Sequence, residues 1–301
     1  MPERIPLTIC PCCNSSSVFP VLSARDHTVS NEVFEIWHCD DCTNRFTQSV
    51  PGAADISPYY QSTSYVSHSD TQKGFINRLY HIIRNHTLST KRKLVQKVSG
   101  KRTGILLDVG AGTGAFVNTM QNAGWKITGL EPDDTARTNA AQKYALDLLS
   151  PELLDTLDEE HFDVITLWHV LEHVHALHPY LENFHRLLKP GGRLLIAVPN
   201  YTSYDAAHYK SFWAAYDVPR HLYHFSPKGM ELLARKKGFV LETVQPMWFD
   251  SFYVSMLSEQ YKNGSANIVG AVWNGLLSNL KAIGNRKKAS SLIYILFKKP
   301  S

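Results

Sequence analysis

The chain has 301 residues, of which 44% are hydrophobic and 19% are charged. This composition excludes disordered, collagenous and coiled-coil proteins, and it suffices for one large core with a small satellite domain. A formal net charge of +4 permits contact with anions but does not require nucleic acid. The N-terminal residues lack the apolar run of a signal peptide, and no apolar run has membrane-spanning length, so we expect a cytosolic protein.

The first predicted element is a metal site built from cysteines. All five cysteines lie between positions 10 and 42, and two pairs, Cys10/Cys13 and Cys39/Cys42, have the Cys-x-x-Cys spacing. Each pair can offer two thiolates to a tetrahedral zinc ion, and four thiolates leave no open position for catalysis. We therefore predict a structural zinc ion, with Cys12 as the odd thiol; the alternative is a reduced cluster or a redox pair.

Residues 1–50 are predicted to form a zinc-ribbon-like module, because β-rich segments at 18–22 and 33–37 separate the cysteine pairs. A linker and a basic helix should occupy 51–102. The helical part, 70–102, carries nine Lys or Arg residues against one acid. It could contact phosphates or RNA, but a solvated helix face that docks through its apolar stripe is the favoured reading.

A nucleotide-binding core is predicted next. A buried strand at 105–109 leads into a turn with Gly110, Gly112 and Gly114, and helical character resumes at 115–120. Glycines at this spacing let the backbone approach a ligand closely. This region should therefore form a ligand-binding turn between strand and helix.

Two carboxylates indicate which ligand it binds. Glu131 ends a second predicted strand at 125–130, where a carboxylate can accept both ribose hydroxyls of an adenosine. Asp108, two residues before the first glycine, suits a ligand with an ammonium group and would repel a pyrophosphate. The combination favours S-adenosylmethionine over a dinucleotide.

The segment 108–114, Asp-Val-Gly-Ala-Gly-Thr-Gly, resembles the first motif of the class I S-adenosylmethionine-dependent methyltransferases, of type 11/23. Segments 161–174 and 187–200 resemble the fourth and fifth strands of that family, so the resemblance covers about 103–247. It implies an α/β fold with a Rossmann-like seven-stranded sheet, the third strand lying near 145–149. No clear motif for the adenine amino group follows that strand.

The resemblance also implies where cofactor and substrate lie, at the carboxyl ends of the strands. The methyltransferase domain should extend over 103–301. Its predicted cofactor-binding residues are Asp108, Gly110, Gly112, Gly114, Glu131, Trp168 and His169.

Candidate catalytic residues follow the fourth strand. His169, Glu172 and His173 lie within one helical turn, and the stretch resembles the ubiquinone-type O-methyltransferases, in which Glu-x-x-Glu-His has been linked to magnesium. Here His169 replaces the first glutamate, which weakens a hard-cation site. The histidines could act as general bases or contact substrate, or they could fix the loop by hydrogen bonds; Glu172 could merely oppose a helix dipole.

An aromatic connection at 201–225 is predicted to overhang the pocket, where a flat or lipid-like acceptor would bind. Within it, Arg220 could hold an acidic group, and His221 is a further catalytic candidate; a packed lid without substrate contact is the alternative. A helical insert at 249–284 could be a lid or a dimer surface. Its amphipathic part, 268–281, could touch a membrane, but core or dimer packing is the preferred interpretation.

The predicted function is transfer of a methyl group from S-adenosylmethionine to an oxygen or nitrogen of a small or lipid-linked molecule, with a homodimer left open. The first alternative is an rRNA methyltransferase that uses the zinc module and the basic helix. Against it, the Asn/Asp-Pro-Pro-Tyr motif of amino-group methylation is absent after the fourth strand. A non-catalytic protein-binding scaffold is the second alternative.

Overall fold

The computed structural model describes residues 4–61, 75–265 and 267–299. Its central sheet has six strands in the order β11-β12-β9-β8-β6-β7. Strands β7, β6, β8 and β9 run parallel, and β12 lies antiparallel between β9 and β11. The strands are β6 (Ile105–Val109), β7 (Lys126–Leu130), β8 (Phe162–Trp168), β9 (Leu188–Pro199), β11 (Phe239–Pro246) and β12 (Ser291–Lys298).

The predicted seventh strand is reduced to a single parallel bridge between Leu130 and Leu149. The extended segment that contains Leu149 starts after Ala145, which ends a helix with a left-handed φ of 53°. The segment ends at Pro151, which has no N–H to donate. This length is too short for a continuous ladder. The prediction of seven strands is therefore wrong by one, although the edge segment lies where the resemblance placed it.

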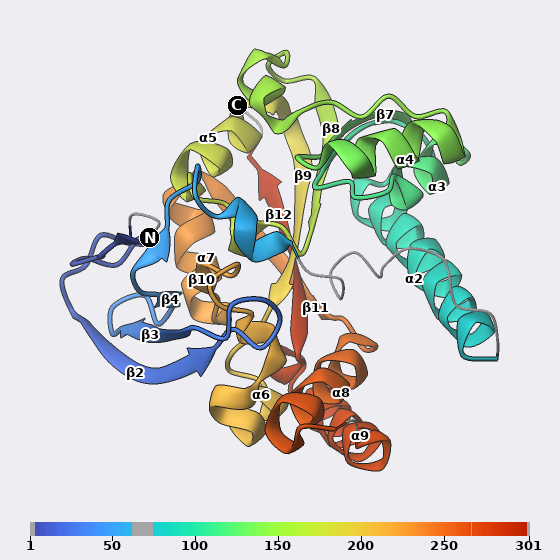
Figure 1. Ribbon diagram of the computed structural model, residues 1–301. Helices are drawn as coiled ribbons and strands as arrows, with labels where there is room; N and C mark the ends of the chain where they lie inside the picture. The colour runs from blue at the N-terminus through green and yellow to red at the C-terminus, as the bar shows by residue number, and fades with distance from the viewer. Residues whose placement is uncertain (1–3, 62–74, 266, 300–301) are drawn as a thin grey trace.

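Alternating side chains of the strands build two cores, one on each face of the sheet. Leu106, Val164 and Leu195 pack with α2 and α3, whereas Leu107 and Ile165 belong to the core that includes α5 and α7. Figure 1 shows α2, α3 and α4 on one side of the sheet and α5 and α7 on the other. The helices are α2 (Phe75–Ser99), α3 (Ala115–Gln121), α4 (Asp134–Tyr144), α5 (Leu177–Leu187) and α7 (Pro227–Lys236).

The predicted helix at 70–102 corresponds to α2, and residues 70–74 lie outside the described residues. Residues 62–69 of the predicted linker also lie outside them. The described part of the linker contains a 3-10 turn, Ser57–Tyr60. This turn approaches the candidate site, as shown below.

The N-terminal module does not close its sheet by itself. Strands β2 (Val18–Arg25), β3 (Val33–Cys39) and β4 (Arg45–Thr47) form an antiparallel sheet whose fourth member is β10 (Tyr223–His224). A separate two-stranded sheet joins β1 (Arg4–Ile5) to β5 (Val50–Pro51). Because β10 lies within the aromatic connection, near its end, the module and the connection form one packed unit.

The aromatic connection and the predicted insert are both helical in part. The connection contains α6 (Tyr204–Tyr209), and the insert forms an antiparallel hairpin of α8 (Asp250–Asn263) and α9 (Ile268–Gly284). Figure 1 shows this hairpin at one end of the molecule, beyond the ends of β11 and β12. No helix among the described residues is long and apolar enough to cross a membrane.

Candidate active site

The turn between β6 and α3 has the backbone that its glycines predict. Gly110, Gly112 and Gly114 have φ values of 72°, 54° and 76°, in the left-handed region that disfavours other residues. A Cβ atom on Gly110 would come within 2.3 Å of Val170, and one on Gly114 within 2.8 Å of Leu146. A Cβ on Gly112 would meet none of the described atoms within 4 Å, so the loop is open at its tip.

Glu131 connects this turn to the end of β7. Its Oε2 accepts a hydrogen bond from the Gly112 N–H at 2.7 Å, and its Oε1 accepts one from the Asp133 N–H at 3.0 Å. Burial raises the pKa of the carboxyl group above its ordinary value, and these backbone donors oppose the rise. The carboxylate is thus held beside the open glycine loop, as a ribose ligand requires.

Asp108 faces a second polar region at the ends of β6 and β8. It is 1% exposed, its Oδ1 accepts a hydrogen bond from Thr166 Oγ1 at 2.6 Å, and burial raises its pKa to about 7. The Nζ atom of Lys91 lies 4.3 Å from the centroid of the Trp168 ring, and burial lowers the Lys91 pKa to about 8 while the charges of Asp108 and Asp250 oppose this. A carboxylate and an ammonium group therefore face the same region, which fits the zwitterionic methionine part of S-adenosylmethionine.

His169 forms ion pairs with two carboxylates. Its Nε2 lies 2.9 Å from Asp250 Oδ2, and its Nδ1 lies 3.4 Å from Glu172 Oε1. Burial alone would lower its pKa, but contacts with the two carboxylates raise the pKa to about 10. At neutral pH the ring is a cation without a lone pair, so the geometry favours loop fixation over a general-base role for His169.

His173 and His221 differ from His169 because each donates one ring hydrogen to a backbone carbonyl. His173 Nδ1 lies 3.1 Å from the Arg220 carbonyl oxygen and 3.0 Å from the Tyr60 hydroxyl, and His221 Nδ1 lies 2.9 Å from the Ala215 carbonyl oxygen. Burial lowers the pKa of His173 to about 4. The Nε2 atom of the neutral His173 ring is left as an acceptor, and the centroids of the His173 and His221 rings are 4.6 Å apart.

Glu172 completes this group. Its side chain is fully buried, and beyond the His169 ion pair its oxygens accept no hydrogen bond from the described residues. One ligand atom each from Glu172, His173 and His221 lies within 4.8 Å of the others. Two imidazoles and one carboxylate differ from the all-oxygen ligand sets that magnesium prefers, and the cationic His169 stands at the position of the first glutamate. The group therefore does not fit magnesium.

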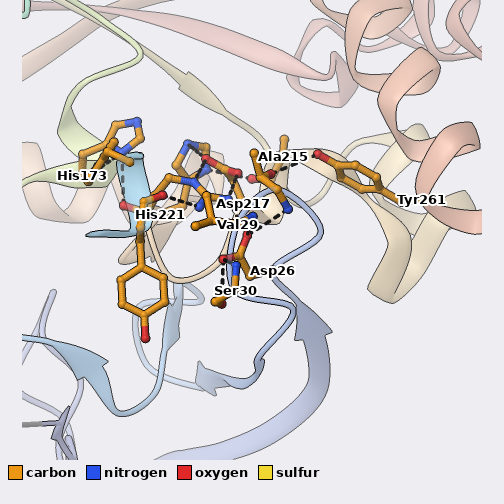
Figure 2. Close-up of polar contacts among 12 residues, drawn as sticks. Asp26, Val29, Ser30, His173, Ala215, Asp217, His221 and Tyr261 are labelled. Carbon is orange, nitrogen blue, oxygen red and sulfur yellow. Dashed lines mark hydrogen bonds and ion pairs between the residues drawn. The ribbon is translucent and has the colours of Figure 1, made fainter. Parts of the chain in front are cut away.

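A buried ion cluster holds the loop that carries His221. Arg220 is 1% exposed and donates to Asp217 at 2.7 and 3.0 Å, to Asp26 Oδ1 at 2.9 Å and to the Tyr59 carbonyl oxygen at 2.8 Å. Asp26 also accepts from the N–H and hydroxyl of Ser30, both at 2.8 Å. Figure 2 shows Asp26 and Asp217 facing each other, with His173 and His221 alongside. The Arg220 guanidinium is thus occupied within the protein rather than presented to an acidic substrate group.

The cysteine cluster is close-packed and lies away from these residues. Cys10 Sγ is 3.6 Å from Cys42 Sγ, and Cys13 Sγ is 3.5 Å from Cys39 Sγ. All four sulfur atoms lie within 4.8 Å of one another. Cys12, the predicted odd thiol, is buried beside them at 2% exposure.

The two cysteine loops have the same backbone geometry. The N–H of Asn14 donates to the Cys10 carbonyl oxygen, the N–H of Thr43 donates to the Cys39 carbonyl oxygen, and each bond is 2.8 Å long. Asn14 and Thr43 have left-handed φ values of 67° and 61°. Paired knuckles of this kind direct two sulfurs each toward one point, so the cluster fits a tetrahedral zinc ion.

Several residues of the site escape sequence reasoning. Lys91, Asp26 and Tyr60 come from the N-terminal third of the chain, and Asp217 and Asp250 come from the aromatic connection and the hairpin. None stands in a recognisable motif. For Lys91 the sequence gives one indication, its position on a helix that is predicted to pack against the rest of the protein through one face.

The methyltransferase domain family model matches residues 81–244, more than half of the chain. The chain therefore belongs to this family, and it is an S-adenosylmethionine-dependent methyltransferase. The match begins inside α2 and ends inside β11, so it includes the glycine turn and both histidine-bearing loops.

Two curated relatives are ubiquinone biosynthesis O-methyltransferases. The protein of Nitrosococcus oceani is 30% identical over 196 residues, covering 60% of this chain and 75% of that protein. The human mitochondrial protein is 29% identical over 163 residues, covering 49% of this chain and 44% of that protein. The chain thus spans less than half of the human relative.

A solved structure with the same fold is the phosphoethanolamine N-methyltransferase 2 of Haemonchus contortus in complex with S-adenosyl-L-methionine. Its TM-score is 0.51 at 17% identity, covering 85% of this chain and 63% of that chain. At this identity the likeness concerns the fold alone.

Proposed function

We propose that the chain transfers a methyl group to an oxygen atom of a small, flat acceptor that is free or lipid-linked. The names of the two curated relatives support oxygen as the methylated atom and a lipid-linked acceptor. Trp213 and Tyr216 of the aromatic connection are each 2% exposed and packed in a core, so a flat acceptor is supported by the quinone that those names contain and not by these rings.

The cofactor-binding part of the proposal assigns a role to each polar group. Glu131 would accept the ribose hydroxyls, Asp108 would face the ammonium group, and Lys91 would face the carboxylate. When bound, S-adenosylmethionine supplies an electrophilic methyl group on a sulfonium. The protein's contribution is to orient the acceptor oxygen in line with that methyl group and to exclude water.

The observation that carries the proposal is the position of His221. Its Nε2 lies 3.9 Å from Asp217 Oδ2, and one of its ring nitrogens lies within 4.8 Å of a carboxylate oxygen of buried Glu172. These two carboxylates would stabilise the imidazolium that forms when Nε2 accepts the proton of an acceptor hydroxyl. His173, whose low pKa keeps it neutral, would donate no proton through Nε2 and would position the acceptor instead.

For the cysteine cluster we propose one structural zinc ion held by Cys10, Cys13, Cys39 and Cys42. Four thiolates close a tetrahedral site, so the ion would stabilise the N-terminal module without taking part in methyl transfer. Its effect on activity would be indirect, through β10 and the aromatic connection.

The test is to incubate the full chain with methyl-labelled S-adenosylmethionine and extracts of its source, then to count label in lipid, small-molecule, RNA and protein fractions. We expect label in the lipid or small-molecule fraction. His221→Gln should lower that rate by about 10² to 10⁴, with unchanged affinity for the cofactor. The control is His161→Gln, an exposed residue just before β8. Label confined to RNA, or full activity of His221→Gln, would contradict the proposal.

A further inference from the structure

In helix α9 the apolar face points toward solvent and the small, polar face points toward the protein, which is the reverse of the usual arrangement in a globular protein. Its large apolar residues are exposed, with Val269 at 81%, Trp273 at 63%, Leu280 at 61% and Ile283 at 70%. With 100° per residue, these side chains and those of Val272 and Leu276 fall within an arc of about 100°. We call this set the α9 stripe: Val269, Val272, Trp273, Leu276, Leu280 and Ile283.

The opposite side of α9 is small and polar, and it is the buried side. Its buried residues are Ala271, Asn274, Gly275, Ser278 and Ala282.

Specific contacts fix this orientation. Ser278 Oγ donates to Asp205 Oδ1 at 2.8 Å, and Asn274 Nδ2 donates to Glu259 Oε1 at 3.3 Å. A Cβ atom on Gly275 would lie 2.6 Å from Cδ1 and 3.1 Å from the Cα atom of Phe252, so a larger residue there would force Phe252 and its helix to shift. The helix cannot rotate its apolar side inward without breaking these contacts. The preferred expectation for 268–281 was core or dimer packing, and its core part is therefore wrong for the stripe residues.

The charged residues near the α9 stripe indicate what kind of partner the stripe binds. From position 264 to the C-terminus the sequence contains no Asp or Glu. Exposed Lys281 lies in the last turn of α9, and exposed Arg286, Lys287 and Lys288 follow the helix. An apolar stripe bordered by cations is complementary to a surface that is apolar inside and anionic outside.

A second copy of this chain is a poorer match. The hairpin has two acidic residues, Asp250 and Glu259. Asp250 is paired with His169, and Glu259 is 5% exposed and accepts hydrogen bonds from Tyr209 and Asn274. The hairpin of another copy would therefore bring cations but no available carboxylate.

We propose that the α9 stripe binds the surface of an anionic lipid bilayer, lying in the plane of the interface. The stripe would enter the boundary between headgroups and acyl chains by about 5 to 10 Å, with Trp273 among the headgroups and the basic residues on phosphates. This inference depends on the hairpin alone, so it stands or falls separately from the proposed acceptor.

The test is sedimentation of the full chain with two kinds of vesicle, phosphatidylcholine alone and phosphatidylcholine mixed with phosphatidylglycerol. We expect binding to the mixed vesicles that weakens as salt rises. Trp273→Gln and Leu280→Gln should each weaken it about tenfold or more without changing the unfolding temperature. The control is Leu153→Gln, an exposed leucine that is 40% exposed far from the hairpin in sequence. A fourfold variant with Gln at Lys281, Arg286, Lys287 and Lys288 should lose the salt dependence.

Three results would overturn the proposal. The first is no vesicle binding by a monomeric chain. The second is a concentration-dependent dimer in sedimentation velocity that Trp273→Gln dissociates, because this assigns the stripe to a second copy. The third is equal binding to both kinds of vesicle, because this removes the role of the basic residues.

Discussion

Replacing Arg220 by Met should destabilise the protein strongly without removing a direct contact to the acceptor. Methionine retains much of the side-chain volume but none of the hydrogen bonds to Asp26, Asp217 and the Tyr59 carbonyl oxygen. Both aspartates would then keep their charges in a buried place without the cation. Breaking a buried ion pair by removing one partner costs about 3 to 5 kcal/mol, so we expect a loss of this size in the free energy of unfolding.

A double-mutant cycle separates the ion cluster from packing effects. Asp26→Asn should cost about 2 kcal/mol, as expected for a hydrogen bond to a charged group. Once Arg220 is absent, the same change removes an unpaired charge and should cost less. The sum of the two single losses should therefore exceed the loss of the double variant by about 1 kcal/mol or more.

The assay is urea unfolding of all four proteins at neutral pH, followed by fluorescence, with the exposed Arg102→Met as the control. The reasoning would be refuted by a loss below about 1 kcal/mol for Arg220→Met, or by additive losses within about 0.5 kcal/mol. A raised KM for the acceptor with little loss of stability would instead return Arg220 to the role of substrate ligand.

Three further predictions concern the cofactor, His169 and zinc. Glu131→Ala should weaken S-adenosylmethionine binding by about 1 to 3 kcal/mol in calorimetry, whereas the exposed Glu152→Ala should not; equal affinities would mean that the second-strand assignment is wrong. His169 has a folded-state pKa of about 10, above its ordinary value of 6.5, so its stabilisation is fully present below pH 6.5 and is lost as pH rises toward 10. His169→Gln should thus cost about 1 to 2 kcal/mol at pH 6, after discounting for a side chain that is 35% exposed, and much less at pH 10; a pH-independent cost would disprove the ion pair. The purified chain should contain about one zinc ion and lose structure on chelation, and a folded, metal-free sample would remove the zinc proposal.

The central half of the fold was predictable because its signals are local. The strand, glycine turn and helix around 105–120 and the strand before Glu131 are encoded in contiguous residues, and the structure has β6, α3 and β7 there. Ser226 followed by Pro227 is likewise a pattern typical of a helix N-terminus, and the Ser226 hydroxyl accepts a hydrogen bond from the Gly229 N–H at 2.9 Å. Local chemistry decides such features before tertiary packing is considered.

Other features depend on partners distant in sequence. Pro190-Gly191-Gly192 is a sequence typical of a turn that ends a helix, yet α5 ends at Leu187 and these residues lie inside β9. The strand accommodates them by a register shift against β8 and a left-handed Gly191 with φ 76°. Pairing with the neighbouring strands has overridden the local turn preference.

The candidate site was half predictable for the same reason. The sequence places His169, Glu172 and His173 in one loop, but the different roles of the histidines are set by Asp250 and Asp217. These carboxylates reach the loop from other parts of the chain. Spacing within one segment can predict proximity, whereas protonation depends on groups that only tertiary structure brings near.

The pairing of β4 with β10 has a consequence for synthesis on the ribosome. Phe46 pairs with Tyr223, and the two positions are 177 residues apart. At usual elongation rates, the N-terminal sheet must wait about 10 to 35 s for its last strand to be made. During that interval the exposed edge of β4 and the cysteine loops beside it would need metal, chaperone or fast local collapse to avoid pairing with another nascent chain. Substitutions in this module would therefore reduce the yield of folded protein mainly by their effect during translation, rather than by lowering the stability of the finished fold.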